Sequence, residues 1–185
     1  MSIIKPNNNI LSSITALPAA ITTGKVLQVV QVAKTDTYSE SISGNSLSST
    51  LVTGLQPSIT PASTSNKVLV MVTLTVGYAS NSTGDSMGFL LKRDATAIAR
   101  GDADGSRTRI TTGNNFSSTF QIEDLSMTFL DTPSSTSSIT YGINLFNGSG
   151  STKSVYLNRD DRNTDANYTA RGMSSITLME IAGWL

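Results

Sequence analysis

The sequence predicts an all-β protein, an antiparallel jelly-roll-like β-sandwich with a short N-terminal arm. Ser and Thr make up roughly three residues in ten, an excess that suits strands with one solvated face. Apolar runs rich in β-branched residues recur along the chain between clusters of Gly, Asn, Asp, Ser and Pro, without a convincing helical stripe. Many short strands separated by turn residues are typical of β-sandwiches and jelly rolls.

The chain divides into two segments. Residues 1–24 are polar and then weakly apolar, with Pro6, Pro18 and a run of three Asn, and we expect them to form an arm that docks onto its own domain or onto a neighbouring protein. Residues 25–185 are predicted to form the β-sandwich domain. A chain of 185 residues that is 38% hydrophobic supplies enough apolar material for one core.

The predicted strands are the apolar runs between turn clusters. Each run is four to eleven residues long, close to the usual length of strands, and several alternate apolar and polar residues. In chain order they are 26–32, 51–59, 68–78, 87–92, 95–99, 125–130, 139–146, 154–157 and 174–182.

Three of these runs, 26–32, 68–78 and 174–182, are apolar on both faces over part of their length. A two-layer sandwich buries only one face of each sheet, so these strands need a second cover. We expect that cover to be another subunit, in a homotrimer, with the N-terminal arm or a long loop as the alternative. The residues expected at this interface are Val29, Val30, Leu69, Met71, Ile176, Leu178, Met179 and Ile181.

Composition argues against several classes of function. The chain has no Cys and no His, which removes disulfides, thiol and imidazole chemistry and most transition-metal sites, and no cofactor is expected. Lys and Arg are scattered and the net charge is zero, so nucleic acid is not an expected partner. No window of about eighteen apolar residues exists, and insertion into a membrane is not expected.

Carboxylates are the remaining candidates for catalysis. A glycosidase needs two of them across a cleft, and Asp131 and Glu180, together with Glu123 and Asp124, lie in or beside predicted strands. For Glu180 the commoner explanation is a buried pair with an Arg such as Arg93. We therefore expect no enzyme. A small carbohydrate-processing depolymerase and a soluble lectin are the alternatives.

One polar segment resembles a calcium loop in its spacing. Oxygen-bearing side chains alternate at Asp161, Asn163, Asp165 and Asn167, but Ala166 stands where the loop needs Gly, and Gly172 where it needs Glu. A solvated turn without a metal is the expected structure. The tripeptide 100–102, Arg-Gly-Asp, is likewise expected to lie in a hairpin loop after Ile98.

Several phrases, in order along the chain, resemble a known family. They are KVLQVVQVAKTDTYS, LQPSITPASTSNKVLVMVTLTVG, LLKRDATAIARGDADGSR, TFLDTPSSTSSITYGINL and SSITLMEIAGWL. They look like a family of virion structural and tail-fibre-like proteins of tailed phages of marine bacteria and cyanobacteria. The resemblance covers about residues 25–183. It implies a jelly-roll head similar to trimeric C1q-like and tumour-necrosis-factor-like domains, with no catalytic residues.

The expected function follows from these features together. The chain is predicted to be a surface subunit of a virion, either a short tail-fibre knob or a capsid-decoration protein, assembled in the host cytoplasm. Its arm would dock onto a capsid or tail protein. The loops 79–86, 102–115 and 158–171 are expected to face outward, where their Gly, Asn and Asp residues suit contact with host-surface polysaccharide.

Overall fold

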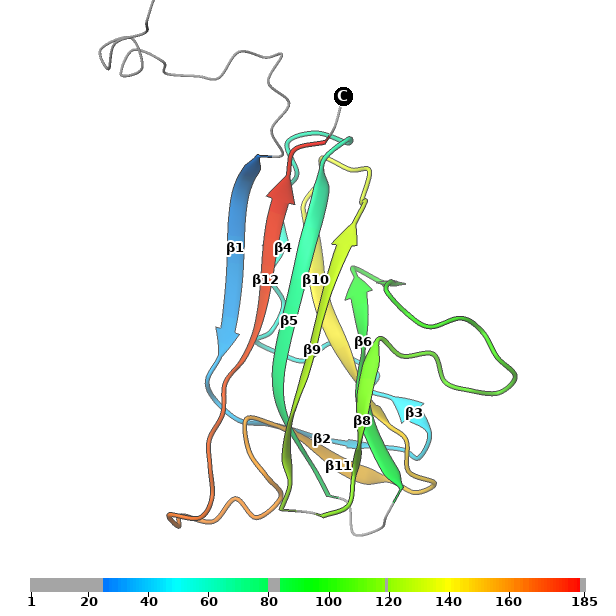
Figure 1. The fold of residues 1–185 in the computed structure, drawn as a ribbon, viewed down its shortest axis with the longest axis vertical. Coiled ribbons are helices and arrows are strands. Elements are labelled where there is room, and N and C mark those ends of the chain that lie inside the picture. Colours follow the sequence, from blue (N-terminus) through cyan, green and yellow to red (C-terminus); the bar gives the residue numbers. More distant parts are fainter. Residues whose placement is uncertain (1–24, 80–83, 119, 184–185) are drawn as a thin grey trace, which may run out of the picture.

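The computed structural model describes residues 25–79, 84–118 and 120–183, and it confirms the predicted antiparallel β-sandwich. Twelve strands form two six-stranded sheets, and the described residues contain no helix (Figure 1). Within these residues, nothing helical is long and apolar enough to cross a membrane. The predicted arm, 1–24, lies outside the described residues.

The first sheet has the long strand β5 at its centre. β5 pairs with β9 along one edge, and along the other with β12 and, near its own C-terminal end, with β11. β1 continues the sheet beyond β12, and β2 continues it beyond β11. The bounds are β1 (Val26–Lys34), β2 (Tyr38–Ile42), β5 (Lys67–Tyr78), β9 (Ile122–Asp131), β11 (Lys153–Leu157) and β12 (Ser174–Ile181).

The second sheet is built on the antiparallel pair of β6 and β10. Two short strands, β3 and β4, pair with β10, and two others, β7 and β8, pair with β6. The bounds are β3 (Ser46–Leu47), β4 (Ser58–Ile59), β6 (Asp85–Arg93), β7 (Thr96–Ala97), β8 (Thr112–Phe116) and β10 (Ile139–Asn147).

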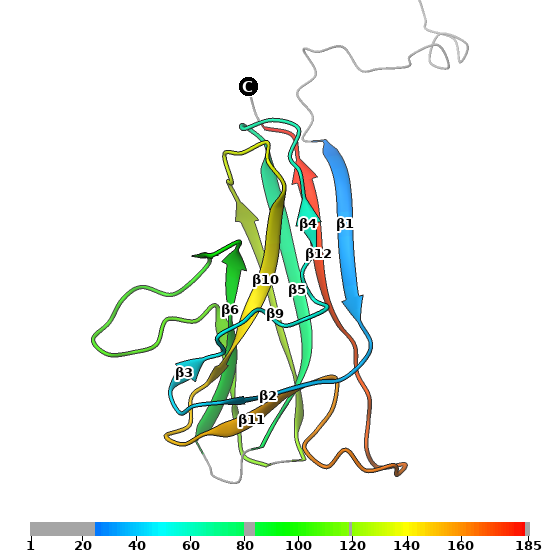
Figure 2. The ribbon, with the colours of Figure 1, turned by 180° about the vertical axis from the view of Figure 1, so that it is seen from behind.

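The chain crosses repeatedly between the two sheets, and its first strand, β1, lies beside its last strand, β12. The order β1-β12-β5-β9 in one layer and β3-β10-β6-β8 in the other is that of a jelly roll. Seen from behind, β10 and β6 lie over β5 and β9, so the two layers face each other (Figure 2).

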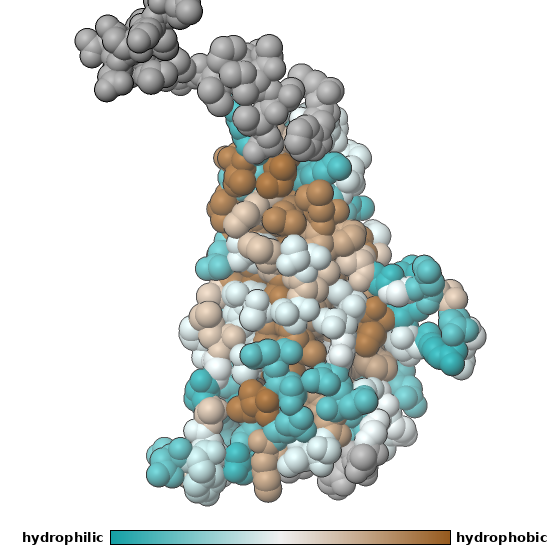
Figure 3. Space-filling model, viewed as in Figure 1, coloured by the Kyte–Doolittle hydropathy of each residue, from teal (hydrophilic) through white to brown (hydrophobic). Residues whose placement is uncertain are grey.

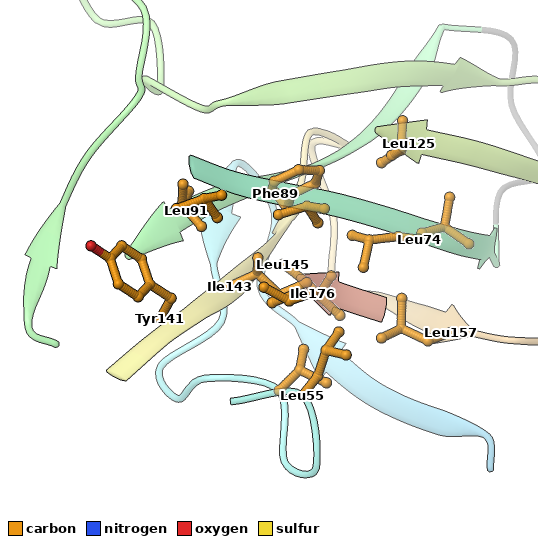
Figure 4. Packing of buried hydrophobic residues seen from close by; sticks show 14 of the residues in the cluster. Leu55, Leu74, Phe89, Leu91, Leu125, Tyr141, Ile143, Leu145, Leu157 and Ile176 are labelled. Atoms are coloured by element: carbon orange, nitrogen blue, oxygen red, sulfur yellow. The ribbon is translucent and has the colours of Figure 1, made fainter. Parts of the chain in front are cut away.

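The core fills the space between the layers. Alternate residues of β5 point into it, and Leu74 is fully buried there against Phe89 of β6 and Leu145 of β10 (Figure 4). Tyr78 packs edge-on against Phe116, with ring centroids 5.6 Å apart. Burying each such side chain contributes about 1.5–3 kcal/mol to the free energy of folding, so the core between the two sheets is the main source of stability.

Two buried asparagines fasten loops to the sandwich. The Nδ2 of Asn147 donates to the carbonyl oxygens of Ile42 and Ser151, at 2.7 and 2.9 Å, and its Oδ1 accepts from the backbone N–H of Ser149 and from the hydroxyl of Tyr78. At the base of the loop between β11 and β12, the side chain of Asn158 likewise donates to backbone carbonyl oxygens of another segment, those of Lys34 and Asp36. Both side chains are fully buried and hydrogen-bonded, so each ties separate segments together.

The structure corrects the predicted strands at several places. The run 51–59 is a strand only at β4, because Gly54 takes a φ of 79° and Leu55 closes a turn onto the Val52 carbonyl. Val52, Leu55 and Ile59 of this run are buried nevertheless. The run 95–99 is a strand only at β7. β2, β3 and β8 were not predicted, because their polar sequences are held by pairing with β11, β10 and β6. β8 also occupies part of the predicted loop 102–115.

Candidate functional site

The outer face of the first sheet carries an apolar row that crosses four strands. Val29 of β1 is paired with Met179 of β12, Met179 with Leu69 of β5, and Leu69 with Leu130 of β9. These four residues face away from the core, because the residues on either side of them in each strand point inward. The row is therefore a continuous apolar strip across the sheet.

The row extends toward the end of the sheet where β1 begins. Val26 pairs there with Ile181, and a β-bulge between Val26 and Gln28 adds Leu27 to the strand. Figure 3 shows apolar residues gathered at this end of the face. We call Val26, Leu27, Val29, Leu69, Leu130, Met179 and Ile181 the apolar sheet face.

Exposed apolar residues are concentrated at two places. The described part of the chain has seven exposed large hydrophobic residues. Four belong to the apolar sheet face, namely Val26, Leu27, Val29 and Leu130, each between 46% and 55% exposed. The other three are Phe120, Tyr168 and Met173, in or beside loops at the opposite end of the sandwich. A contiguous apolar patch on a small protein is typical of an interaction surface.

The structure separates the eight residues predicted for a subunit interface into two groups. Val29, Leu69, Met71, Met179 and Ile181 lie on the outer face of the first sheet. The other three point inward: Ile176 and Leu178 are fully buried in the core, and Val30 packs against it. An interface on this sheet would therefore use the first group, with Val26, Leu27 and Leu130 added.

Glu180 lies on the inner face at the same end of the sheet, and only 1% of it is exposed. Its Oε1 accepts from the Asn66 Nδ2 at 2.5 Å and from the Ala62 N–H at 2.7 Å, and its Oε2 accepts from the Gln28 Nε2 at 2.6 Å. The predicted pairing with Arg93 is wrong. Three uncharged donors from two segments, β1 and the 60–66 loop, hold this carboxylate, which fastens both segments to β12.

Burial raises the pKa of Glu180, but the hydrogen bonds from Gln28, Asn66 and the Ala62 N–H outweigh it, and the pKa lies below its ordinary value of 4.5. The charged form is therefore the one that the folded chain favours. Its contribution to stability is complete above about pH 4.5 and is lost as the pH falls through the lower pKa of the folded state.

We expect Glu180→Gln to lower the free energy of unfolding by about 1–3 kcal/mol at pH 7, because an amide supplies one acceptor where three donors converge. The difference from the unsubstituted chain should shrink as the pH falls below 4.5. Urea unfolding between pH 3 and 7 measures it. Asp165→Asn, in an exposed loop, makes the same change of charge and should have little effect. A difference that grows toward acid pH would contradict the assignment.

Arg93 pairs with Asp131 instead. Its Nη1 lies 3.0 and 2.9 Å from the two carboxylate oxygens, and the Tyr141 hydroxyl donates to Asp131 at 2.6 Å. Burial and the neighbouring carboxylate raise the pKa of Tyr141 well above its ordinary value, so it remains a donor. Asp131 and Glu180 flank Val68 in adjacent strands, but each is buried and fully engaged in bonds that hold segments together.

The segment with calcium-like spacing has other contacts. Asp161 accepts a hydrogen bond from the Tyr156 hydroxyl, and Asn163 accepts one from Arg171 at 2.5 Å. Asp165 and Asn167 are exposed. No group of three or more acidic residues that could hold a metal ion occurs in 25–79, 84–118 or 120–183. The segment 100–102 lies in an exposed loop after Ile98, as predicted, where the Arg109 Nε donates to the Gly101 carbonyl at 2.6 Å.

Comparisons with known proteins find similarity in structure but not in sequence. No family model matches the sequence, and no curated protein matches it. Among solved structures, the fold is similar to a chain in a structure of the infectious bursal disease virus Gt strain, at 14% identity and a TM-score of 0.35. The match covers 84% of this chain and 38% of that one, so this chain spans less than half the length of the viral chain. At this TM-score the similarity supports no functional argument.

Proposed function

We propose that the chain is a structural subunit on the surface of a phage particle, and that copies of it associate through the apolar sheet face. The observation that carries this proposal is the row of Val29, Met179, Leu69 and Leu130. Val29 and Leu130 are about half exposed in the single chain, and exposed apolar strips that cross a whole sheet are costly unless covered. A second copy presents the same strip and offers a cover of the same chemistry.

Three copies are the form that the sequence resemblance implies for a jelly-roll head of this kind. The face that would be covered lies at the end of the sheet where β1 begins (Figure 1). In the proposal, residues 1–24 dock onto a capsid or tail protein there. The loops at the opposite end then point away from the particle, toward host-surface polysaccharide.

Immunogold electron microscopy tests the location. Antibodies raised against the recombinant chain should label the outside of intact phage particles from the source of the sequence. The matched control is the same serum absorbed with the recombinant chain, which should label nothing. Labelling that appears only in the particle-free fraction, or only after particles are broken open, would contradict a place on the particle surface.

A further inference from the structure

The loop between β11 and β12 is held rigidly onto the end of the sandwich opposite the apolar sheet face (Figure 1). At its base, the Nδ2 of Asn158 donates to the carbonyl oxygens of Lys34 and Asp36, at 2.8 and 2.7 Å. A Cβ on Gly77 of β5 would lie 2.2 Å from the Arg159 carbonyl oxygen, so only glycine lets the loop backbone lie this close to the sheet. Residues 158 and 159, where the loop begins, are therefore held in place against the sheet.

A buried carboxylate then fixes an arginine at the surface of this loop. Asp160 is 1% exposed, and its Oδ2 accepts from the Nε and Nη2 of Arg162 at 2.7 and 2.5 Å. Its Oδ1 accepts from the backbone N–H of Arg162 at 3.1 Å. A guanidinium bound through two of its nitrogens to a buried carboxylate has a set orientation. Its Nη1 donates no hydrogen bond within the described residues.

Two exposed aromatic rings lie against this guanidinium. The ring centroid of Phe120, between β8 and β9, is 4.6 Å from the Arg162 Cζ, and that of Tyr168 is 5.3 Å from it. The two residues are nevertheless 58% and 65% exposed. Stacking on a fixed cation restrains both rings while most of their surface stays open to solvent. Large aromatic residues that are both restrained and exposed are typical of recognition sites.

The charges around the rings balance. Residues 158–173 contain three Arg and three Asp, and the charge of Arg162 is neutralised by Asp160. The surrounding side chains that reach solvent include Asn163, Thr164 and Asn167, which offer hydrogen bonds without net charge. An uncharged ligand with apolar C–H faces and a rim of hydroxyl groups matches this surface, because its faces stack on rings while its hydroxyls bond to amides and to a guanidinium.

From this geometry we infer that Phe120, Arg162 and Tyr168 form a binding site for an uncharged saccharide. The inference rests on the proposed surface location of the chain, and it names the residues and the ligand class through which that surface would contact a host polysaccharide. Phe120 and Tyr168 provide the stacking surface. The free Nη1 of Arg162 donates to a sugar hydroxyl.

Saturation-transfer difference NMR on the full chain tests the inference. The probes are uncharged trisaccharides of glucose, mannose, galactose and N-acetylglucosamine, with a trisaccharide of galacturonic acid for the charged class. At least one uncharged probe should bind. Phe120→Ala and Tyr168→Ala should each weaken that binding about fivefold or more, because stacking on the ring is lost. Tyr168→Phe keeps the ring and should retain most of the binding, as should Arg107→Ala in the separate loop after β7.

Three results of this NMR experiment would overturn the site. They are binding of no uncharged probe, preference for the galacturonic acid probe, and binding that both alanine variants leave unchanged. Thermal melting shows that the variants are folded, since substitutions of exposed side chains should leave the melting temperature nearly unchanged. Light scattering on the same samples reports association separately, so loss of the saccharide site and loss of the proposed assembly are distinguishable. A protein receptor bound through the same rings, with no saccharide bound, would also overturn it.

Discussion

Leu69→Glu is expected to dissociate the assembled chain into monomers. Leu69 lies in the middle of the apolar row, between Met179 and Leu130, so an interface on this face must bury the new carboxylate. Burying a charge without a partner costs about 3 kcal/mol or more, which corresponds to at least about a hundredfold in the dissociation constant. Sedimentation velocity should therefore show the variant at the single-chain mass of 19.5 kDa.

The matched control for this substitution is Thr73→Glu. Thr73 lies on the same strand and the same outer face, but in a row with Ser175 and Ser126 instead of apolar residues. Its glutamate should remain in solvent and leave association intact. An unchanged mass for Leu69→Glu, or equal dissociation of both variants, would show that copies do not associate through the apolar row.

Asn158→Leu is expected to lower the free energy of unfolding by about 3–5 kcal/mol. The substitution leaves the Lys34 and Asp36 carbonyl oxygens without their buried donor and removes the acceptor of the Ser174 hydroxyl. It also places a branched side chain at a φ of 64°, which costs about 1–2 kcal/mol for residues other than Gly, Asn and Asp. Urea unfolding monitored by circular dichroism measures the loss.

Two variants separate these causes. Asn163→Leu makes the same change at an exposed residue with a φ of 48°, so it should show the backbone strain without the buried hydrogen bonds. Asn158→Gly relieves the strain but still lacks the amide, and it should recover only part of the stability. If Asn163→Leu cost as much as Asn158→Leu, the buried amide would not be what holds the loop.

The sequence predicts the alternation of side chains along a single strand, but it does not tell which face of the strand points into the core. In β12, Ile176 and Leu178 alternate with Met179 and Ile181, and both sets are apolar. Only the strands on either side and the second sheet decide which set enters the core. The interface prediction therefore contained residues from both faces, and the structure assigns Ile176 and Leu178 to the interior.

Strands without an apolar pattern could not be predicted from the sequence, because they too depend on neighbouring strands. β8 has the sequence TGNNF, in which only Phe116 is buried, and it is a strand because β6 supplies its hydrogen-bonding partner. The cluster of Phe120, Arg162 and Tyr168 was missed because it joins two loops that are distant in sequence. The one available signal was an aromatic residue, Tyr168, in an otherwise polar segment.

The two ends of the sandwich differ in chemistry. One end carries the apolar sheet face, and the other carries polar loops with exposed rings over a fixed arginine. This arrangement suits a subunit that associates at one end and presents a recognition surface at the other. The proposal for the particle surface and the inference of a saccharide site use opposite ends and are tested by separate measurements.

The molar mass of the unsubstituted chain in solution tests the central claim most directly. Light scattering behind size exclusion, repeated over a range of dilutions, should give a mass near three times 19.5 kDa that persists on dilution. A mass of 19.5 kDa at every concentration would contradict association through the apolar sheet face, and the cover of that face would then have to come from the chain itself or from another protein.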